Sequence, residues 1–282
     1  MNSQRDIQRE RLFYLEFLAV FTGRVGRKDL VERFGISEAA ATKDLSLYAK
    51  LATDVLQYDI REKTYVLSKA KPYFDHDVSQ SLYSLSGERA IAIDASHAKR
   101  LESWITPSIS RNLDLNLVST ITRCMYKQLE MKVSYISLSS GKQSKTLTPL
   151  ALVNDGLRWH IRCFDHTKNR YADFNLTRFI DVKDTDVSNK NILNADPEWN
   201  KEVTLSLKPH PELEHPETIS MDYDLVNGVK EITLKSCLVG YFLRHWNIDY
   251  SANASGSPKA QQLFLDNREE LISNGLDEWH LK

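Results

Sequence analysis

The stretch GLRWHIRCFDHTKNRYADFNLTRF, residues 156 to 179, places four arginines among large apolar residues. They are Arg158, Arg162, Arg170 and Arg178. Apolar and polar residues alternate on both sides of DHTKN, which predicts a β-hairpin with one buried face and a single returning strand over YADFNLTRFIDV. An unpaired charge is unfavourable in a half-buried sheet, so we expect these guanidinium groups to have a binding partner.

Period-two alternation divides the first strand of this hairpin into two faces. The apolar face consists of Leu157, Trp159, Ile161 and Cys163. The opposite face consists of Arg158, His160, Arg162 and Phe164, and the preceding strand adds Tyr135, Ser137 and Ser139 at the same spacing. Guanidinium forks bind phosphate and an aromatic ring stacks, so this set is expected around an anionic, planar ligand such as a nucleotide or short nucleic acid.

The alternation also has an interpretation without a ligand. Arginines on a half-exposed sheet commonly form a solvated face or pair across strands with carboxylates, here Asp165, Asp173 or Asp181. Spacing alone favours this second interpretation, and both stay open at this point.

Motifs for catalysis or metal binding do not occur in the sequence. SSGKQS, residues 139 to 144, lacks the earlier glycine of a phosphate-binding loop, and we interpret it as a hairpin turn. G-x-S-x-G, H-E-x-x-H and C-x-x-C are missing, so we expect no catalytic residue, no metal and no cofactor. The remaining candidates are Cys124, Cys163 and Cys237, expected as reduced core residues, and His210 and His215, expected on the surface.

The charge of the chain is unevenly distributed. A net charge of −1 argues against a generally basic nucleic-acid coat. Lys and Arg outnumber Asp and Glu by 12 to 10 in residues 1–70 and by 17 to 13 in residues 71–190, but are outnumbered by 15 to 8 in residues 191–282. An anion-binding surface therefore belongs to the first two thirds. The polar start and the lack of a long apolar run place the protein in the cytosol.

The N-terminal periodicities predict three helices and a hairpin, the order of a winged helix-turn-helix. The helices are expected over residues 7 to 22, 28 to 34 and 38 to 52, and the hairpin over residues 55 to 67. Gly35 permits the sharp turn, and Ser37 is a good N-cap for the third helix. Short polar side chains off the apolar stripe of that helix fit a major groove, and basic side chains fit phosphates. The predicted DNA-binding residues are Lys28, Ser37, Ala39, Thr42, Lys43, Ser46, Arg61 and Lys63.

The run LVERFGISEAAATKDLSLY resembles the winged helix-turn-helix of bacterial repressors. Its third helix matches their Ser-then-Arg/Lys-Asp-Leu pattern through Ser37 and the triplet Lys43-Asp44-Leu45. The alternative is a plain three-helix packing unit with an exposed charged face. Turn, cap and wing together favour DNA binding.

The arginine-rich hairpin is similar to the core of the WYL domain, a small Sm-like β-barrel. Its Trp-Tyr-Leu triplet stands here as Trp159-His160-Ile161, so the role of the middle tyrosine cannot simply be transferred. With the preceding YISLSSGKQSKTLTPLALVNDG, the chain resembles, over nearly its full length, the WYL-domain repressors found beside bacterial phage-defence islands. That resemblance implies a homodimer that represses a defence operon and senses a nucleic-acid-derived ligand. The implied ligand-binding residues are Tyr135, Ser137, Ser139, Arg158, His160, Arg162, Arg170, Asn175 and Arg178.

These observations predict an α+β multidomain protein of bacterial cytoplasm, associated with the nucleoid. Its parts are a winged helix-turn-helix over residues 1–70, a helical linker over 71–128, the WYL sensor over 129–190 and an α/β dimerisation domain over 191–282. The expected partners are operator DNA, a second copy of the chain and a nucleotide or nucleic-acid-derived effector. Two alternatives remain: a transcriptional activator, and a nucleotide-processing enzyme with Asp173 or His160 as general base.

Overall fold

The computed structural model describes residues 2–68, 71–85, 109, 111–188 and 192–281. The chain divides into two compact units, which we describe separately. The first consists of Met1–Val153 and Trp159–Lys190, and the second of Asn154–Arg158 and Asn191–Lys282. Both contain helices and sheets, as the α+β prediction requires. No helix in the described part is long and apolar enough to cross a membrane.

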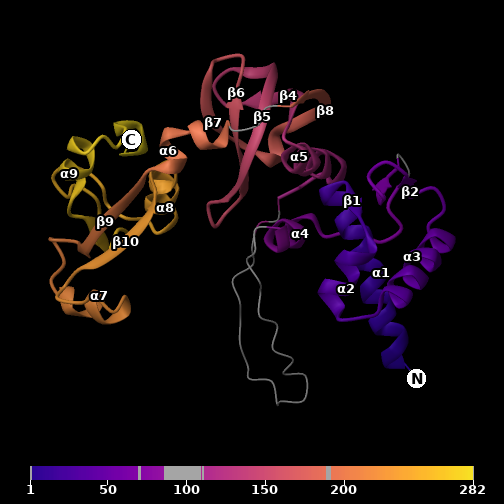
Figure 1. The fold of residues 1–282 in the computed structure, drawn as a ribbon. Coiled ribbons are helices and arrows are strands. Elements are labelled where there is room, and N and C mark those ends of the chain that lie inside the picture. Colours follow the sequence, from indigo (N-terminus) through magenta and orange to yellow (C-terminus); the bar gives the residue numbers. More distant parts are fainter. Residues whose placement is uncertain (1, 69–70, 86–108, 110, 189–191, 282) are drawn as a thin grey trace. The chain divides into compact units, whose positions relative to one another are not determined.

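The first unit begins with the predicted helices and hairpin (Figure 1). The helices are α1 (Asn2–Thr22), α2 (Arg27–Phe34) and α3 (Glu38–Leu51). Strands β1 (Arg24–Val25), β2 (Leu56–Asp59) and β3 (Thr64–Leu67) form an antiparallel sheet in the order β1-β3-β2. The β2–β3 hairpin is the wing, and the short strand β1 fastens it to the end of α1.

The turn between α2 and α3 has the predicted construction. Gly35 adopts a φ of 63°, which favours glycine. The Ser37 side chain caps α3 by accepting a hydrogen bond of 3.2 Å from the backbone N–H of Ala40. On the inner face of α3, Leu45 and Tyr48 are buried in the N-terminal core. The turn and the apolar stripe therefore fix which face of α3 points outward.

Two helices lie in the segment predicted as a linker, α4 (Val78–Leu85) and α5 (Leu115–Lys127). The polar stretch DHDVSQSLYSLSG is typical of a plain connection, but its residues Val78–Leu85 form α4 and bury Leu82 completely in the core of the sheet. The stretch ERAIAIDASHAK, which gave no clear pattern, lies outside the described residues.

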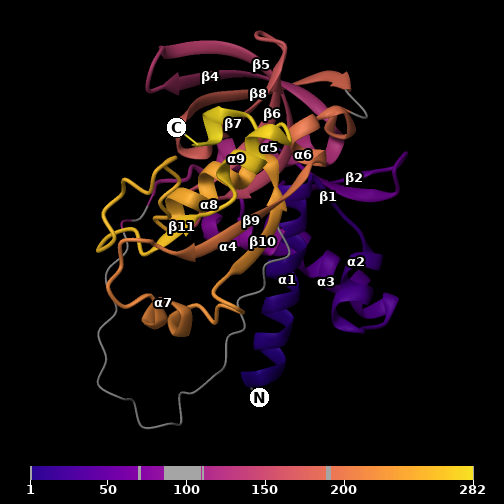
Figure 2. The same cartoon turned by 90° about the vertical axis from the view of Figure 1, so that its left-hand side faces the viewer.

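A five-stranded antiparallel sheet follows, in the order β7-β6-β5-β4-β8 (Figure 2). Its strands are β4 (Leu129–Ser137), β5 (Gly141–Asn154), β6 (Trp159–Asp165), β7 (Arg170–Asn175) and β8 (Phe179–Ser188). The turn between β4 and β5 is the one predicted at SSGKQS. In this order β7 and β8 lie at opposite edges, and no pairing between them closes the sheet among the described residues. The small barrel therefore stays a prediction.

YADFNLTRFIDV forms two strands, and the prediction of one continuous strand was wrong. A 3-10 turn, η1 (Leu176–Arg178), separates β7 from β8. The Asn175 side chain accepts hydrogen bonds from the Thr177 backbone N–H at 3.0 Å and from its hydroxyl at 2.8 Å, which stabilises the turn. Arg178 consequently lies on a turn and does not continue the alternation of the strand.

The sheet and the N-terminal helices share one hydrophobic core. Phe21 at the end of α1 packs in the same cluster as Ile121 of α5 and Ile161 of β6, and all three are fully buried. The Arg123 side chain of α5 also donates a hydrogen bond of 2.9 Å to the backbone oxygen of Val20. Helix α5 is thus packed between the sheet and α1.

The second unit contains a small sheet and short helices. Its sheet has the order β10-β9-β11, built from β9 (Glu202–Pro209), β10 (Lys230–Lys235) and β11 (Leu263–Leu265). Its helices are α6 (Pro197–Asn200), α7 (Pro216–Asp222), α8 (Val239–His245) and α9 (Arg268–Ser273), with short 3-10 turns at Leu193–Ala195, Ser236–Leu238 and Glu278–Leu281.

The predictions for the histidines and for the cysteines have different outcomes. His210 was expected on the surface but is fully buried, with its Nε2 at 3.1 Å from Oδ2 of Asp249, whereas His215 is exposed as predicted. The cysteines Cys124, Cys163 and Cys237 are buried and free, as predicted. Burial raises the pKa of Cys124 to about 11, which leaves its thiol protonated and unreactive.

Candidate nucleic-acid interface and ligand face

Helix α3 presents an exposed stripe with helical spacing. Its members are Ala39, Thr42, Lys43, Ser46, Ala49 and Lys50. Residues three and four apart share one face of a helix, so these side chains form a continuous surface. The Thr42 hydroxyl donates to the backbone oxygen of Glu38 at 2.8 Å, and the Ser46 hydroxyl donates to that of Thr42 at 2.9 Å. Both hydroxyl oxygens can still accept a hydrogen bond from a base edge.

The inner side of α3 is anchored to α1 by a buried carboxylate. The Asp44 side chain is 2% exposed and lies 2.6 Å from Nε of Arg11, and it accepts a further hydrogen bond of 2.9 Å from Gln8. An ion pair satisfied in this way is rigid because both partners would lose their hydrogen bonds if the helices moved apart. Asp44 therefore holds α3 on α1 and does not belong to the exposed stripe.

A second carboxylate, Glu16, lies on α1 itself and is fully buried. It accepts hydrogen bonds from the Tyr48 hydroxyl, the backbone N–H groups of Tyr73 at 2.6 Å and Phe74 at 2.8 Å, and Nε2 of His76 at 2.8 Å. Tyr48 belongs to α3, and the other donors follow the wing. One side chain of α1 thus binds both α3 and the segment that follows the wing.

The hydrogen bonds around Glu16 also set its protonation state. Burial alone would raise its pKa, but the bonds from His76, Tyr48 and the backbone amides outweigh burial and lower it. Burial and the bond to Glu16 raise the pKa of Tyr48, so that Tyr48 remains a protonated donor. The cluster is therefore a carboxylate surrounded by donors.

The wing presents basic side chains at a rigid tip. Oδ1 of Asp59 accepts hydrogen bonds from the backbone N–H of Arg61 at 2.8 Å and of Glu62 at 3.1 Å, and Lys63 has a φ of 52°. Arg61 and Lys63 are both exposed. Lys28 on α2 is 85% exposed and forms only a loose pair with Glu32 at 3.5 Å, which a phosphate can replace.

Arg162 occupies the polar face of the five-stranded sheet, but it is 1% exposed. It pairs at 3.2 Å with Asp173, which lies directly opposite on β7. For this arginine, the structure therefore shows the cross-strand pair with a carboxylate that the interpretation without a ligand predicts. A guanidinium group binds a phosphate in the same forked geometry in which it binds a carboxylate.

Other predicted ligand residues are distributed over several environments. His160 and Asn175 are buried and face each other across β6 and β7. Tyr135, predicted on the polar face, instead lies in the core, where its ring packs on Phe174 and Phe179 with centroids 5.1 Å away and its hydroxyl accepts from the Asn175 N–H. Its alternation follows the core residues of β4, so its ring is not available for stacking.

The remaining predicted residues lie nearer to solvent. Ser137 and Ser139 hydrogen-bond to each other at 3.2 Å beside the β4–β5 turn, Arg170 is exposed, and Arg178 is half-buried on η1. Arg158 belongs to the short segment of the second unit, where its Nε lies 3.4 Å from Asp155. The structure therefore does not bring all nine residues together on one face.

Sequence reasoning missed Glu16, Asp44 as an anchor, and Lys50. The spacing that selected Ser46 also selects Lys50, one turn further along the exposed stripe, so this residue could have been found. Glu16 could not, because a lone acidic residue inside the apolar run of a helix gives no indication of the donors that reach it from distant segments.

Family models match the chain in the order of these elements. Residues 7–85 match the BrxR transcriptional regulator winged helix-turn-helix domain, residues 116–184 match the WYL domain, and residues 202–271 match the BrxR transcriptional regulator C-terminal dimerization domain. Fold and matches define the class: a winged-helix transcriptional regulator with a WYL domain and a dimerisation domain.

Curated relatives identify the family within this class. The DNA-binding transcriptional repressor CapW of Escherichia coli strain KTE188 is 32% identical over 94% of this chain and 91% of its own length. CapW of Stenotrophomonas maltophilia is also 32% identical over 94% and 91%, and CapW of Pseudomonas aeruginosa is 29% identical over 94% and 90%. The chain belongs to the family of WYL-domain transcriptional regulators that includes these CapW proteins.

Replacing Glu16 with Gln should lower the free energy of unfolding by about 2–4 kcal/mol, because the amide NH₂ cannot accept from the donors that now surround a carboxylate. Urea denaturation at neutral pH measures this loss. Glu62→Gln, at the exposed wing tip, is the matched control and should change stability by less than about 0.5 kcal/mol.

The difference in stability between the wild-type protein and Glu16→Gln should depend on pH. Because the folded-state pKa of Glu16 is lowered, its contribution is present above the unfolded pKa and is lost as the pH falls through the folded pKa. The stability difference between wild type and Glu16→Gln should therefore shrink in acid. A difference that stays constant down to about pH 3 contradicts the ionised assignment.

Proposed function

We propose that this protein is a sequence-specific repressor that binds a pseudo-palindromic operator as a homodimer. The observation that carries the proposal is the exposed stripe of α3, whose opposite face is fixed by Asp44 and Glu16. Two copies of α3 would enter successive major grooves, with half-sites about one helical turn, ~34–36 Å, or a small multiple apart. Arg61 and Lys63 of the wing would hold the flanking backbone.

Dimerisation supplies affinity for DNA that one winged helix-turn-helix domain lacks. Residues 1–70 carry 12 basic against 10 acidic side chains, so a single head gains little from nonspecific attraction to DNA. Joining two heads makes the second contact intramolecular and multiplies the affinity. The region that matches a C-terminal dimerisation domain is the expected site of that contact, and a monomer should bind operator poorly.

The effector response belongs to the WYL domain, in the Sm-like barrel form that the family resemblance implies. We assign the ligand face to Arg162, Arg170 and Arg178 with His160 and Asn175, and a phosphate of a nucleotide or nucleic-acid fragment would compete with Asp173 for Arg162. Binding needs a differential affinity of about 1–3 kcal/mol between two arrangements of the reading heads to release DNA.

The biological setting follows the family resemblance. A bacterial cytoplasmic repressor associated with the nucleoid would act on a neighbouring phage-defence operon. An activator differs only in where its operator lies relative to the promoter. The genes downstream and a reporter fused to the chain's own upstream region distinguish the two, because deletion of the regulator raises expression only if it represses.

Replacing Thr42 and Lys43 with Ala should weaken binding to the upstream duplex by at least about 30-fold, since two contacts of about 1–3 kcal/mol each are lost. Fluorescence anisotropy of the labelled duplex measures the affinity. The melting temperature should not change because both side chains are exposed. Undiminished binding would remove α3 from the interface.

Replacing Arg170 and Arg178 with Gln should leave operator binding intact but raise about tenfold the concentration of a short single-stranded oligonucleotide needed for release. Arg162 and Asp173 are unsuitable for this test, since replacing either one breaks their buried ion pair and costs about 3–5 kcal/mol. Unchanged release by the Arg170 and Arg178 variant contradicts the assigned face.

A further inference from the structure

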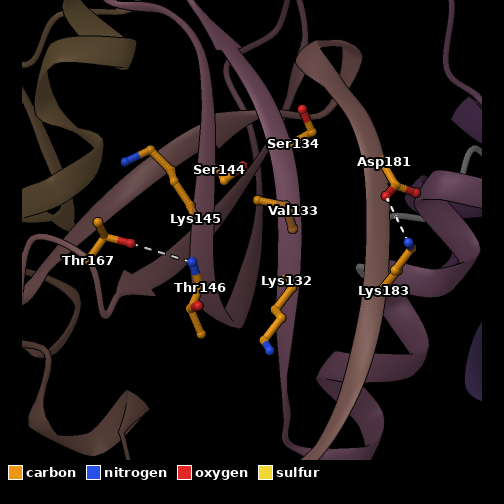
Figure 3. A pocket seen from close by; sticks show the side chains of 9 residues that line it. All are labelled: Lys132, Val133, Ser134, Ser144, Lys145, Thr146, Thr167, Asp181 and Lys183. Carbon is orange, nitrogen blue, oxygen red and sulfur yellow. Dashed lines mark hydrogen bonds and ion pairs between the residues drawn. The ribbon is translucent and has the colours of Figure 1, made fainter.

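An open hollow of about 410 Å³ lies on the β5, β4 and β8 side of the five-stranded sheet (Figure 3). Side chains from these strands and from the turn after β6 line it. We call it the lysine groove. It is lined by Lys132, Val133, Ser134, Ser144, Lys145, Thr146, Thr167, Asp181 and Lys183. Arg162, Arg170 and Arg178 of the ligand face assigned above are not among the residues that line this groove.

Strand register explains the composition of the groove. Lys132 lies opposite Thr146 on one side and opposite Lys183 on the other. Met131 and Val133, its neighbours along β4, are buried in the core, so the alternating positions face away from it. The same register places Ser134 between Ser144 and Asp181. The outward face here is a ladder of lysines and hydroxyls.

The paired lysines make this face electrostatically unfavourable without an anion. Like charges directly opposite each other on neighbouring strands are destabilising. Lys183 has only a loose pair with Asp181 at 3.7 Å, both largely exposed, and Lys132 has no ion pair within the described residues. Lys145 is already neutralised by Asp165 at 2.8 Å. Two lysines therefore remain for a ligand.

The chemistry of the lining selects phosphate rather than a base. Lysine is a compact point charge that binds phosphate oxygens without orientational demand, and serine and threonine hydroxyls add donors. No aromatic ring and no guanidinium lines the groove, so nothing there stacks on a base or reads its edge. Because the hollow is open, a chain of phosphates can pass through it.

We propose that the lysine groove binds the phosphate groups of a nucleic-acid strand without regard to sequence. Lys132 and Lys183 contact neighbouring phosphates, and the hydroxyls of Ser134, Ser144 and Thr146 add hydrogen bonds. The groove thus holds the backbone of a strand on a part of the sheet that the effector proposal does not use.

The test uses the full chain carrying Thr42→Ala and Lys43→Ala, so that α3 contributes little. Binding of a fluorescent oligothymidylate is measured by anisotropy at about 50 and 200 mM salt. Neutralising two phosphates of a single strand contributes about 1.4 to the slope of log affinity against log salt, so this fourfold rise in salt should weaken the parent chain ~7-fold more than Lys132→Gln with Lys183→Gln.

Two matched variants separate charge at the groove from charge in general. Lys230→Gln with Lys259→Gln removes the same charge from the second unit and should keep the parent slope. Lys132→Arg with Lys183→Arg keeps the charge in place and should also retain it. The Lys132 and Lys183 Gln variant should melt at the same or a higher temperature, because it relieves repulsion.

Several outcomes would overturn the proposal. One is an unchanged salt slope in the Gln variant, and another is equal loss in the Lys230 and Lys259 control. Displacement of the strand by inorganic phosphate at equal phosphate concentration would reveal a site for a free anion instead. None of these readouts uses operator release, so a failure here leaves the proposed repressor function standing.

Discussion

Two buried carboxylates on the N-terminal helices are the constraint on which the DNA-facing surface depends. Asp44 with Arg11, and Glu16 with the hydroxyl of Tyr48, join two successive turns of the inner face of α3 to α1. A buried charge left without its partners is strongly unfavourable, so these contacts are either made together or lost together. These buried contacts determine the orientation of the exposed stripe of α3.

Helix α1 extends this constraint to the sheet. Its second half carries Glu16, and its last turn packs with α5 in the core of the five strands, where Arg123 donates to the Val20 oxygen. A shift of α5 must therefore be accommodated by α1, because close-packed interiors do not leave room for independent movement. Under the proposed function, an effector bound to the sheet would act on the winged helix-turn-helix through this shared core.

Local signals predicted the elements that form locally. The turn at Gly35, the Ser37 cap and the apolar stripe of α3 depend only on residues that are close in sequence. Alternation also placed Trp159 and Ile161 correctly in the core. Partners brought together by tertiary structure were not predictable. Arg162 meets Asp173 only once β6 and β7 pair, Tyr135 turned toward the core with its strand, and the break at Asn175 interrupted the alternation that had grouped Arg178 with the others. His210, in a polar and Pro-rich context, was misplaced because Asp249 comes from far along the chain.

The most direct measurement is the specificity ratio, the affinity for the operator duplex divided by that for a scrambled duplex, in Asp44→Asn. Asp44 faces α1 and touches no DNA, so its replacement loosens α3 without removing a contact residue. If the buried anchor orients the recognition helix, the ratio falls by about tenfold or more while scrambled-duplex binding changes little. A folded Asp44→Asn dimer with an unchanged ratio would contradict the anchoring role of the buried carboxylates.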